Sequence, residues 1–89
     1  MIKNIYTIFD KISKTWTIPF FEINNEKVFR DFQYLINEKN DENSEISLFY
    51  KDKELWTLGT FSLENGKINL LSEPTKIIDL IKLKSEQTK

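Results

Sequence analysis

The sequence predicts a small α+β domain, in which an antiparallel sheet of about four strands, arranged as two hairpins, packs with one central helix and a short C-terminal helix. Three observations predict this fold. Residues 2–9 are rich in β-branched and aromatic side chains, residues 28–36 carry apolar side chains at helical spacing, and an Asn65-Gly66 turn signal separates two further apolar runs. The chain has 89 residues, which suits a single domain over residues 1–89.

The first predicted hairpin spans residues 2–21. Residues 2–9 form its first strand, and we expect both faces of this strand to be covered because apolar groups occupy both parities. Residues 15–21 resume the strand character. Pro19 has no N–H group to donate to a neighbouring strand, so this second strand is expected at a sheet edge, or its pairing ends there.

The clearest helix follows this hairpin. Asn24 or Asn25 is suited to cap its N-terminus, and Glu26 lies in the first turn, where the helix dipole favours a negative charge. The apolar side chains recur on one helical face, at Val28, Phe29, Phe32, Leu35 and Ile36. Residues 37–45 contain no apolar side chain and are expected to form an acidic surface loop. Residues 46–50 fit either a short strand or a turn-rich segment.

The second hairpin, residues 54–71, is predicted from the Asn65-Gly66 dipeptide. A two-residue type I′ turn needs positive φ at both central positions, and Asn followed by Gly supplies it at low cost. Gly59 interrupts the apolar face of the first strand. Such a glycine marks a bulge or a close approach by another backbone, such as another strand or a neighbouring subunit, and we favour the bulge.

The chain is expected to end in a short helix. Glu73-Pro74 should end the preceding strand, because proline cannot extend a central ladder, and Thr75 then resembles an N-cap. The side chains of this helix that are expected to face the protein core are Ile77, Ile78, Ile81 and Leu80. Residues 85–89 are expected to fray.

The composition argues against catalysis. The chain has no Cys and no His, which removes thiolate chemistry, the commonest metal ligands and the side chain best suited to proton transfer near neutral pH. It also lacks the glycine-rich phosphate-binding motifs and the nucleophile-elbow motif. We therefore expect no enzyme, and no catalytic, cofactor or metal site. No apolar run is long enough for a membrane span or a signal peptide, so an intracellular location is expected.

Aromatic and basic side chains alternate along two segments. Proteins that bind single-stranded nucleic acid use this pattern, because bases stack on the aromatic rings while Lys side chains neutralise phosphates. The competing interpretation is that aromatic residues at strand spacing belong to the core, and the residues alone favour it. The net charge of −1 requires any such contact to use a local patch. The candidate nucleic-acid-binding residues are Lys11, Lys14, Trp16, Tyr50, Lys51, Lys53 and Trp56.

The order of several short segments along nearly the whole chain resembles the small non-structural, so-called DNA-binding protein of gokushoviruses, which are single-stranded-DNA phages of the microvirus group. The segments are Ile5–Asp10, Pro19–Phe21, Val28–Phe32, Asp52–Phe61, Glu64–Ile68 and Glu73-Pro74. This resemblance implies a virus-encoded protein of the host cytoplasm, absent from the virion shell. It implies association with viral DNA or the replication complex, and support for the switch from genome replication to packaging.

Two functional hypotheses follow. The first is a homodimeric DNA-binding protein, with single-stranded DNA and viral replication or packaging proteins as its partners. The second is an adaptor that recruits or inhibits replication machinery without touching DNA, which the near-neutral net charge motivates. The dimer is expected because a chain of this size buries one modest core, and association would supplement its stability.

Overall fold

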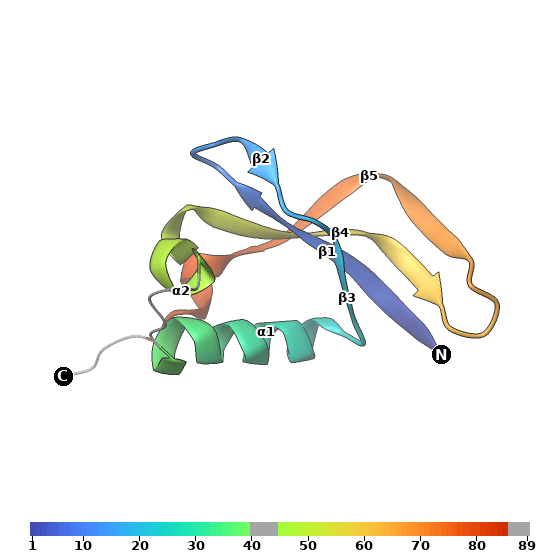
Figure 1. Cartoon of the computed structure of the whole chain (residues 1–89), viewed down its shortest axis with the longest axis horizontal. Helices are drawn as coiled ribbons and strands as arrows, with labels where there is room; N and C mark the ends of the chain where they lie inside the picture. Colours follow the sequence, from blue (N-terminus) through green and yellow to red (C-terminus); the bar gives the residue numbers. More distant parts are fainter. Residues whose placement is uncertain (40–44, 86–89) are drawn as a thin grey trace.

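The computed structural model describes residues 1–39 and 45–85, which form a curled antiparallel sheet with the helical elements gathered on one side (Figure 1). This confirms the predicted α+β fold. The elements are β1 (Ile2–Asp10), β2 (Thr15–Trp16), β3 (Phe20–Glu22), α1 (Asn25–Tyr34), a π-helical turn (Leu35–Lys39), α2 (Glu45–Phe49), a 3-10 turn (Tyr50–Asp52), β4 (Lys53–Ser62), β5 (Ile68–Asp79) and a second 3-10 turn (Leu80–Leu83).

The strand order is β2-β1-β4-β5, and β3 pairs with β1 further along the same edge. The strand predicted over residues 15–21 is thus two short strands, with Phe9 opposite Trp16 and Tyr6 opposite Phe20. Pro19 lies in the connection between them, where its missing N–H costs no ladder hydrogen bond. Both strands lie at an edge and pair only with β1, as expected for a segment that contains proline.

The core lies between α1 and one face of the sheet. β1 and β4 contribute Tyr6, Ile8 and Leu55, α1 and the following turn contribute Val28 and Ile36, and the C-terminal turn adds Leu80 and Leu83. The predicted apolar face of the helix is confirmed, with Phe29 and Phe32 packed partly buried against this cluster. The prediction that β1 is covered on both faces is also confirmed, because the consecutive residues 5–8 are all buried.

Asn24 is the residue that caps α1. Its side-chain Oδ1 accepts a hydrogen bond from the backbone N–H of Lys27 at 2.9 Å. The following residue, Asn25, instead accepts a hydrogen bond from the Tyr6 hydroxyl at 2.7 Å. The two adjacent amides therefore have different roles, one satisfying the end of the helix and the other joining the helix to the sheet.

The helix continues beyond the predicted start of the acidic loop. Residues 37–39 belong to the π-helical turn, in which Asn37 Nδ2 donates to the carbonyl oxygens of Gln33 at 2.9 Å and Leu83 at 3.0 Å. Residues 40–44 of the predicted loop lie outside the described residues. Residues 45–52 are helical, so of the two interpretations of residues 46–50 the strand is wrong. Of the predicted frayed end, only Ser85 is described, and its N–H donates to Asn37 Oδ1 at 2.8 Å.

The β4–β5 turn is longer than the predicted two-residue type I′ turn. The Ser62 N–H donates to the Lys67 carbonyl, and the Gly66 N–H donates to the Ser62 carbonyl, both at 2.9 Å, which leaves residues 63–66 as the loop. Gly66 has φ +73°, but Asn65 does not share a positive φ. Asn65 Oδ1 instead accepts the Lys67 N–H at 3.0 Å, so its side chain organises the turn.

β5 runs through Pro74, where the sequence predicted that the strand would end. The register passes from Gly59 opposite Leu70 to Thr57 opposite Thr75, so Leu58 alone faces four residues of β5, and Pro74 lies in this bulge of an edge strand. The strand then continues to Asp79, and the helix predicted from Thr75 is confined to the 3-10 turn Leu80–Leu83. Two consequences are that Ile78 pairs with Leu55 in the sheet and that Ile81 is exposed, not buried.

Gly59 combines the bulge and the close backbone approach that the sequence left open. Its φ is +152°, and a Cβ built there would meet the Asn69 carbonyl oxygen and lie 2.8 Å from the Cα of Leu70. The close neighbour is therefore β5 of the same chain.

Among the described residues, no helix is long and apolar enough to cross a membrane.

Candidate nucleic-acid interface

The face of the sheet opposite α1 carries a cluster of three aromatic rings. Cross-strand partners share a face, and the register places Phe9 opposite Trp16 and Thr7 opposite Trp56. The ring centroids of Phe9 and Trp16 lie 4.6 Å apart, and those of Trp16 and Trp56 lie 5.1 Å apart in an edge-to-face arrangement. Trp16 remains 47% exposed. The cluster therefore lies at the protein surface, where its three rings pack against one another.

Trp56 is held by a hydrogen bond in addition to its ring contacts. Its indole Nε1–H donates to the Glu54 carboxylate at 2.9 Å, and Glu54 also lies 3.3 Å from the ammonium of Lys76. A partly buried indole N–H is stabilised by such a partner, and the ion pair with Lys76 keeps that carboxylate in place. Trp56 thus forms the fixed inner wall of the cluster, and Trp16 presents the accessible ring.

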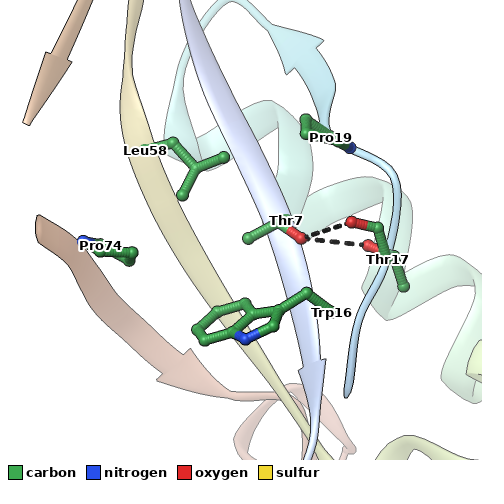
Figure 2. Close-up of a pocket in the computed structure, with 6 residues that line it drawn as sticks. All are labelled: Thr7, Trp16, Thr17, Pro19, Leu58 and Pro74. Atoms are coloured by element: carbon green, nitrogen blue, oxygen red, sulfur yellow. Dashed lines mark hydrogen bonds between the residues drawn. The ribbon is translucent and has the colours of Figure 1, made fainter.

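A pocket of about 260 Å³ opens beside the Trp16 indole (Figure 2). Its walls come from β1, from β2 with the β2–β3 connection, from β4 and from the bulge of β5. The lining residues are Thr7, Trp16, Thr17, Pro19, Leu58 and Pro74. The volume lies just below the range of about 300–1,000 Å³ that is typical of pockets for drug-sized ligands. A single flat ring system, such as a nucleobase, suits this size.

The polar atoms of the pocket wall are already bonded to one another. The Thr7 hydroxyl donates to the Thr17 carbonyl at 2.9 Å and lies 3.3 Å from the Thr17 hydroxyl (Figure 2). The Thr17 hydroxyl in turn accepts from the Ile8 N–H at 3.0 Å. The pocket therefore offers apolar and aromatic contact with little hydrogen-bonding capacity, which suits stacking more than recognition of base edges.

A second aromatic pair extends this face toward the β4–β5 turn. The rings of Phe21 and Phe61 lie 5.7 Å apart, and the register places Phe61 opposite Lys3. Phe21 pairs with Ile5, whose parity is that of Thr7, so this pair lies on the same face as the tryptophans. Aromatic rings thus occur at two places along this face of the sheet.

The charges around the tryptophans are nearly balanced. The Lys76 ammonium lies 2.9 Å from Asp79 and 3.3 Å from Glu54, and Lys11 lies 4.0 Å from Asp79. The hydrogen bond to Asp79 raises the pKa of Lys76, and the same bond lowers the pKa of Asp79. Lys14, in the β1–β2 turn, forms no ion pair with the described residues. Of the two lysines in the β1–β2 turn, Lys14 is therefore the one that is free to contact a phosphate, because Lys11 is paired with Asp79.

The structure brings together some of the predicted site residues and separates others. Trp16 and Trp56 contact each other, and Lys11 and Lys14 lie in the turn beside them. Lys51 is exposed in the 3-10 turn Tyr50–Asp52, which meets the β1–β2 turn through a hydrogen bond from the Lys11 N–H to the Asp52 carbonyl at 2.9 Å. Tyr50 packs against the core cluster, with the Lys84 ammonium 6.0 Å from its ring centroid.

Lys53 points away from this surface. It pairs with Asp10, whose parity is that of Tyr6 and Ile8, and its side chain is only 4% exposed. Its ammonium lies 2.8 Å from Asp10 and 3.5 Å from Glu45. The Lys53 ammonium is therefore already paired with two carboxylates, and it is not available to a phosphate in this structure.

Sequence reasoning missed Phe9, Lys76 and the apolar walls Leu58 and Pro74. Phe9 was available from its position opposite Trp16 once the first hairpin was predicted. Lys76 and Pro74 were hidden because the sequence placed a helix from Thr75, which would have removed both from the sheet. Leu58 lines the pocket because the bulge of β5 lies across from it.

A larger hollow of about 480 Å³ lies on α1 and the turn that follows it, lined by Arg30, Asp31, Tyr34 and Leu35. All four residues come from one continuous helical segment, so no second element closes over the hollow. The pocket beside Trp16 is built from four separate segments and is the better candidate for a binding site.

The fold and this surface define a small α+β protein whose sheet is covered by helices on one face and carries an aromatic pocket on the other. Residues 3–83 match the model of the family described as Phage ORF5 protein. The chain therefore belongs to the Phage ORF5 family and is a phage protein. No curated protein and no solved structure matches the chain.

Proposed function

We propose that this phage protein is a non-enzymatic DNA-binding protein that holds single-stranded DNA, alone or within a replication complex, in the cytoplasm of the infected host. The observation that carries the proposal is the half-exposed Trp16 ring, which packs against Trp56 and lines an apolar pocket. Lys14, in the turn just before β2, forms no ion pair with the described residues. The role that fits the gokushovirus resemblance is support of the switch from genome replication to packaging, together with viral replication or packaging proteins.

Stacking would provide most of the affinity. A base on an aromatic ring contributes about 1–3 kcal/mol, and every base has a face that can stack, so recognition would be tolerant of sequence. The pocket wall supports this mode because its hydroxyl groups are engaged with one another. The second ring pair, Phe21 and Phe61, lies on the same face and would receive further bases of the strand.

Phosphate contacts would contribute less than in strongly basic binding proteins. Lys11 and Lys76 are paired with carboxylates, and the net charge of the chain is −1. We therefore expect a shallow salt dependence, with log K falling by about 0.7 per log unit of salt for each phosphate neutralised on a single strand.

Fluorescence anisotropy with a labelled single-stranded oligonucleotide, at low and at physiological salt, tests the proposal. Trp16→Ala should weaken binding about 5- to 150-fold, which corresponds to the loss of one stacked base. Tyr34→Ala is the matched control, because Tyr34 is 55% exposed and belongs to α1 on the covered side. Absence of binding, equal effects of both variants, or affinity that does not fall as salt rises would overturn the proposal.

The second candidate is an adaptor that binds replication proteins without touching DNA. The observation that favours it is the near-neutral charge cluster of Lys11, Lys76, Glu54 and Asp79 beside the tryptophans, since charges of both signs can meet complementary charges on a protein partner. Pull-down from infected cells after nuclease treatment separates the two candidates. Partners that persist support the adaptor, and loss of every partner counts against it.

A further inference from the structure

β5 is an edge strand of the sheet and carries exposed apolar side chains. In the strand order it has β4 on one side and, among the described residues, no strand on the other. Ile68 is 54% exposed, Leu70 is 69% exposed and Leu71 is 45% exposed. Soluble proteins protect such edges with charges, proline or a covering element, because an open apolar edge recruits another strand. From Ile68 to Ser72, β5 has no charged residue and no proline.

The exposed apolar residues Ile68 and Leu70 of β5 belong to the β4–β5 hairpin and precede the bulge at residues 71–74. Figure 1 shows the β4–β5 hairpin extending beyond α1.

The open hydrogen-bonding groups of β5 can be assigned from its contacts with β4. The Lys67 carbonyl bonds to the Ser62 N–H, and the Asn69 carbonyl lies against Gly59, so both odd-numbered residues face β4. Successive residues of a strand direct their backbone groups to alternate sides. The N–H and C=O groups of Ile68 and Leu70 therefore point away from β4, whereas residues 71–74 lie in the bulge, where β4 does not set the alternation.

We propose that β5 pairs antiparallel with β5 of a second copy of this chain, about a two-fold axis at Leu70. Leu70 then lies opposite Leu70 of the partner subunit and exchanges two backbone hydrogen bonds with it. Ile68 then lies opposite the partner's Ser72, which is in the bulge of the partner's β5. The pairing is isologous and closes at two copies, which makes one continuous sheet across the dimer.

The charges at the ends of the segment select this partner and this register. Lys67 lies three residues before Leu70 and Glu73 lies three residues after it, so each Lys67 falls opposite the partner's Glu73. Both side chains are exposed, and neither forms a salt bridge with the described residues of its own chain. Pro74 has no N–H to donate, and the turn at residues 63–66 precedes the segment, so the pairing is confined between them.

The interface is independent of the proposed DNA contact. It uses the backbone edge of β5, whereas the pocket beside Trp16 lies on the face of the sheet. Failure of DNA binding would leave this inference intact, and a monomeric protein would leave the DNA proposal intact.

Light scattering after gel filtration tests the assembly. The wild-type chain should have twice its mass of 10.7 kDa. Leu70→Lys should shift the protein to the monomer mass, because two like charges would meet at the axis, with folding checked by circular dichroism. Ile12→Lys is the matched control, since Ile12 is 73% exposed in the β1–β2 turn, and it should remain a dimer. A monomeric wild type, an open series of larger species, or a folded Leu70→Lys dimer would overturn the proposal.

A cross-linking experiment tests the register and does not depend on Leu70→Lys folding. The chain has no cysteine, so a single introduced thiol reports one contact. Directly opposed Cα atoms in a hydrogen-bonded pair lie about 5.5 Å apart, within the range that a disulfide spans. Under mild oxidation Leu70→Cys should form a covalent dimer, and Ile12→Cys should not. Failure of Leu70→Cys to cross-link, or equal cross-linking of both variants, would overturn the two-fold axis at Leu70.

Discussion

The ammonium of Lys53 lies 2.8 Å from the carboxylate of Asp10, on the face of the sheet that α1 and α2 share. The Lys53 side chain is 4% exposed and that of Asp10 is 22% exposed, so the pair is partly shielded from water. Asp10 also accepts hydrogen bonds from the backbone N–H groups of Ile12 at 2.8 Å and Ser13 at 3.1 Å. One carboxylate thus joins β1, β4 and the β1–β2 turn.

Because of this arrangement, the free energy of unfolding should depend on pH in the acid range. The hydrogen bond from Lys53, followed by those from Ser13 and Ile12, lowers the pKa of Asp10 from 3.8 to about 2. Because the folded pKa lies below the unfolded value, the contribution is fully present above about pH 5 and is lost as the pH falls through about 4 toward 2. Denaturant melts across this range should show the free energy of unfolding declining with pH.

Asp10→Asn is the variant that isolates this effect. It removes the titrating group, so the variant should be less stable than the wild type at neutral pH and should lose less of its remaining stability between about pH 4 and pH 2. Asp79→Asn serves as a comparison, because the pKa of Asp79 is also lowered, chiefly by its hydrogen bond with Lys76. Parallel pH profiles for wild type and Asp10→Asn would contradict the role of Asp10.

The burial of Lys53 also separates stability from DNA affinity. Lys53→Gln should lower the melting temperature, because it breaks the pair with Asp10, and should leave the affinity of the folded protein for an oligonucleotide unchanged. Lys14→Gln should do the opposite, lowering affinity and reducing the salt slope by about 0.7 with little effect on melting. Anisotropy and thermal melts on both variants make the comparison. A loss of affinity in Lys53→Gln at a temperature where it is folded would place Lys53 in the interface after all.

The parts of the fold that the sequence predicted well depend on local signals. The helical period of Val28 to Ile36 and the capping amide before it are encoded within one segment, and the structure confirms both. The β-branched run of β1 is equally local. The sequence wrongly predicts that the strand ends at Pro74 and that a helix begins at Thr75. Proline usually ends a strand, but β5 lies at the edge of the sheet and bulges at Pro74, and no local pattern shows either feature.

The candidate site was only partly predictable for a related reason. A basic residue in a strand points to one face or the other according to register, and a shift of one residue exchanges the faces. Lys53 and Trp56 are three residues apart in β4, which places them on opposite faces, yet the sequence grouped them as one patch. The contact between Trp16 and Trp56 depends on two separate pairings with β1, which no local pattern encodes.

The two tryptophans should stabilise each other as well as any ligand. Edge-to-face aromatic pairs contribute about 0.5–1.5 kcal/mol beyond the area that they bury. A double-mutant cycle with Trp16→Ala, Trp56→Ala and the double variant should therefore give a coupling of about that size in urea unfolding. The corresponding cycle of Trp16 with Tyr34, which lies on α1, should give a coupling near zero. Equal couplings in both cycles would show that the indoles do not interact in solution.

The cap of α1 gives a prediction about the side chain of Asn24. Asn24→Ala should destabilise the protein by about 1 kcal/mol, because the Lys27 N–H loses its side-chain acceptor. Asn24→Asp should retain the cap and add a favourable charge at the helix N-terminus. Gln33→Ala, at an exposed position of the same helix, should change stability by less than about 0.5 kcal/mol. Denaturant unfolding of the three variants tests this ranking, which fails if Gln33→Ala costs as much as Asn24→Ala.

Gly59 and Gly66 both have positive φ, but the structure gives them different tolerance for a side chain. At Gly59 a Cβ would meet the Asn69 carbonyl oxygen and lie 2.8 Å from the Leu70 Cα, whereas at Gly66 no atom lies within 4 Å. Gly59→Ala therefore combines backbone strain with a clash and should cost about 3–5 kcal/mol. Gly66→Ala should cost only the strain of a left-handed residue, about 1–2 kcal/mol. Urea unfolding of the two variants measures both terms. Because the clash would push β5 away from β4 at Leu70, Gly59→Ala should also weaken the proposed dimer, and Gly66→Ala should leave its mass unchanged. Equal costs for the two substitutions would mean that β5 does not approach β4 as closely as the Gly59 contacts indicate.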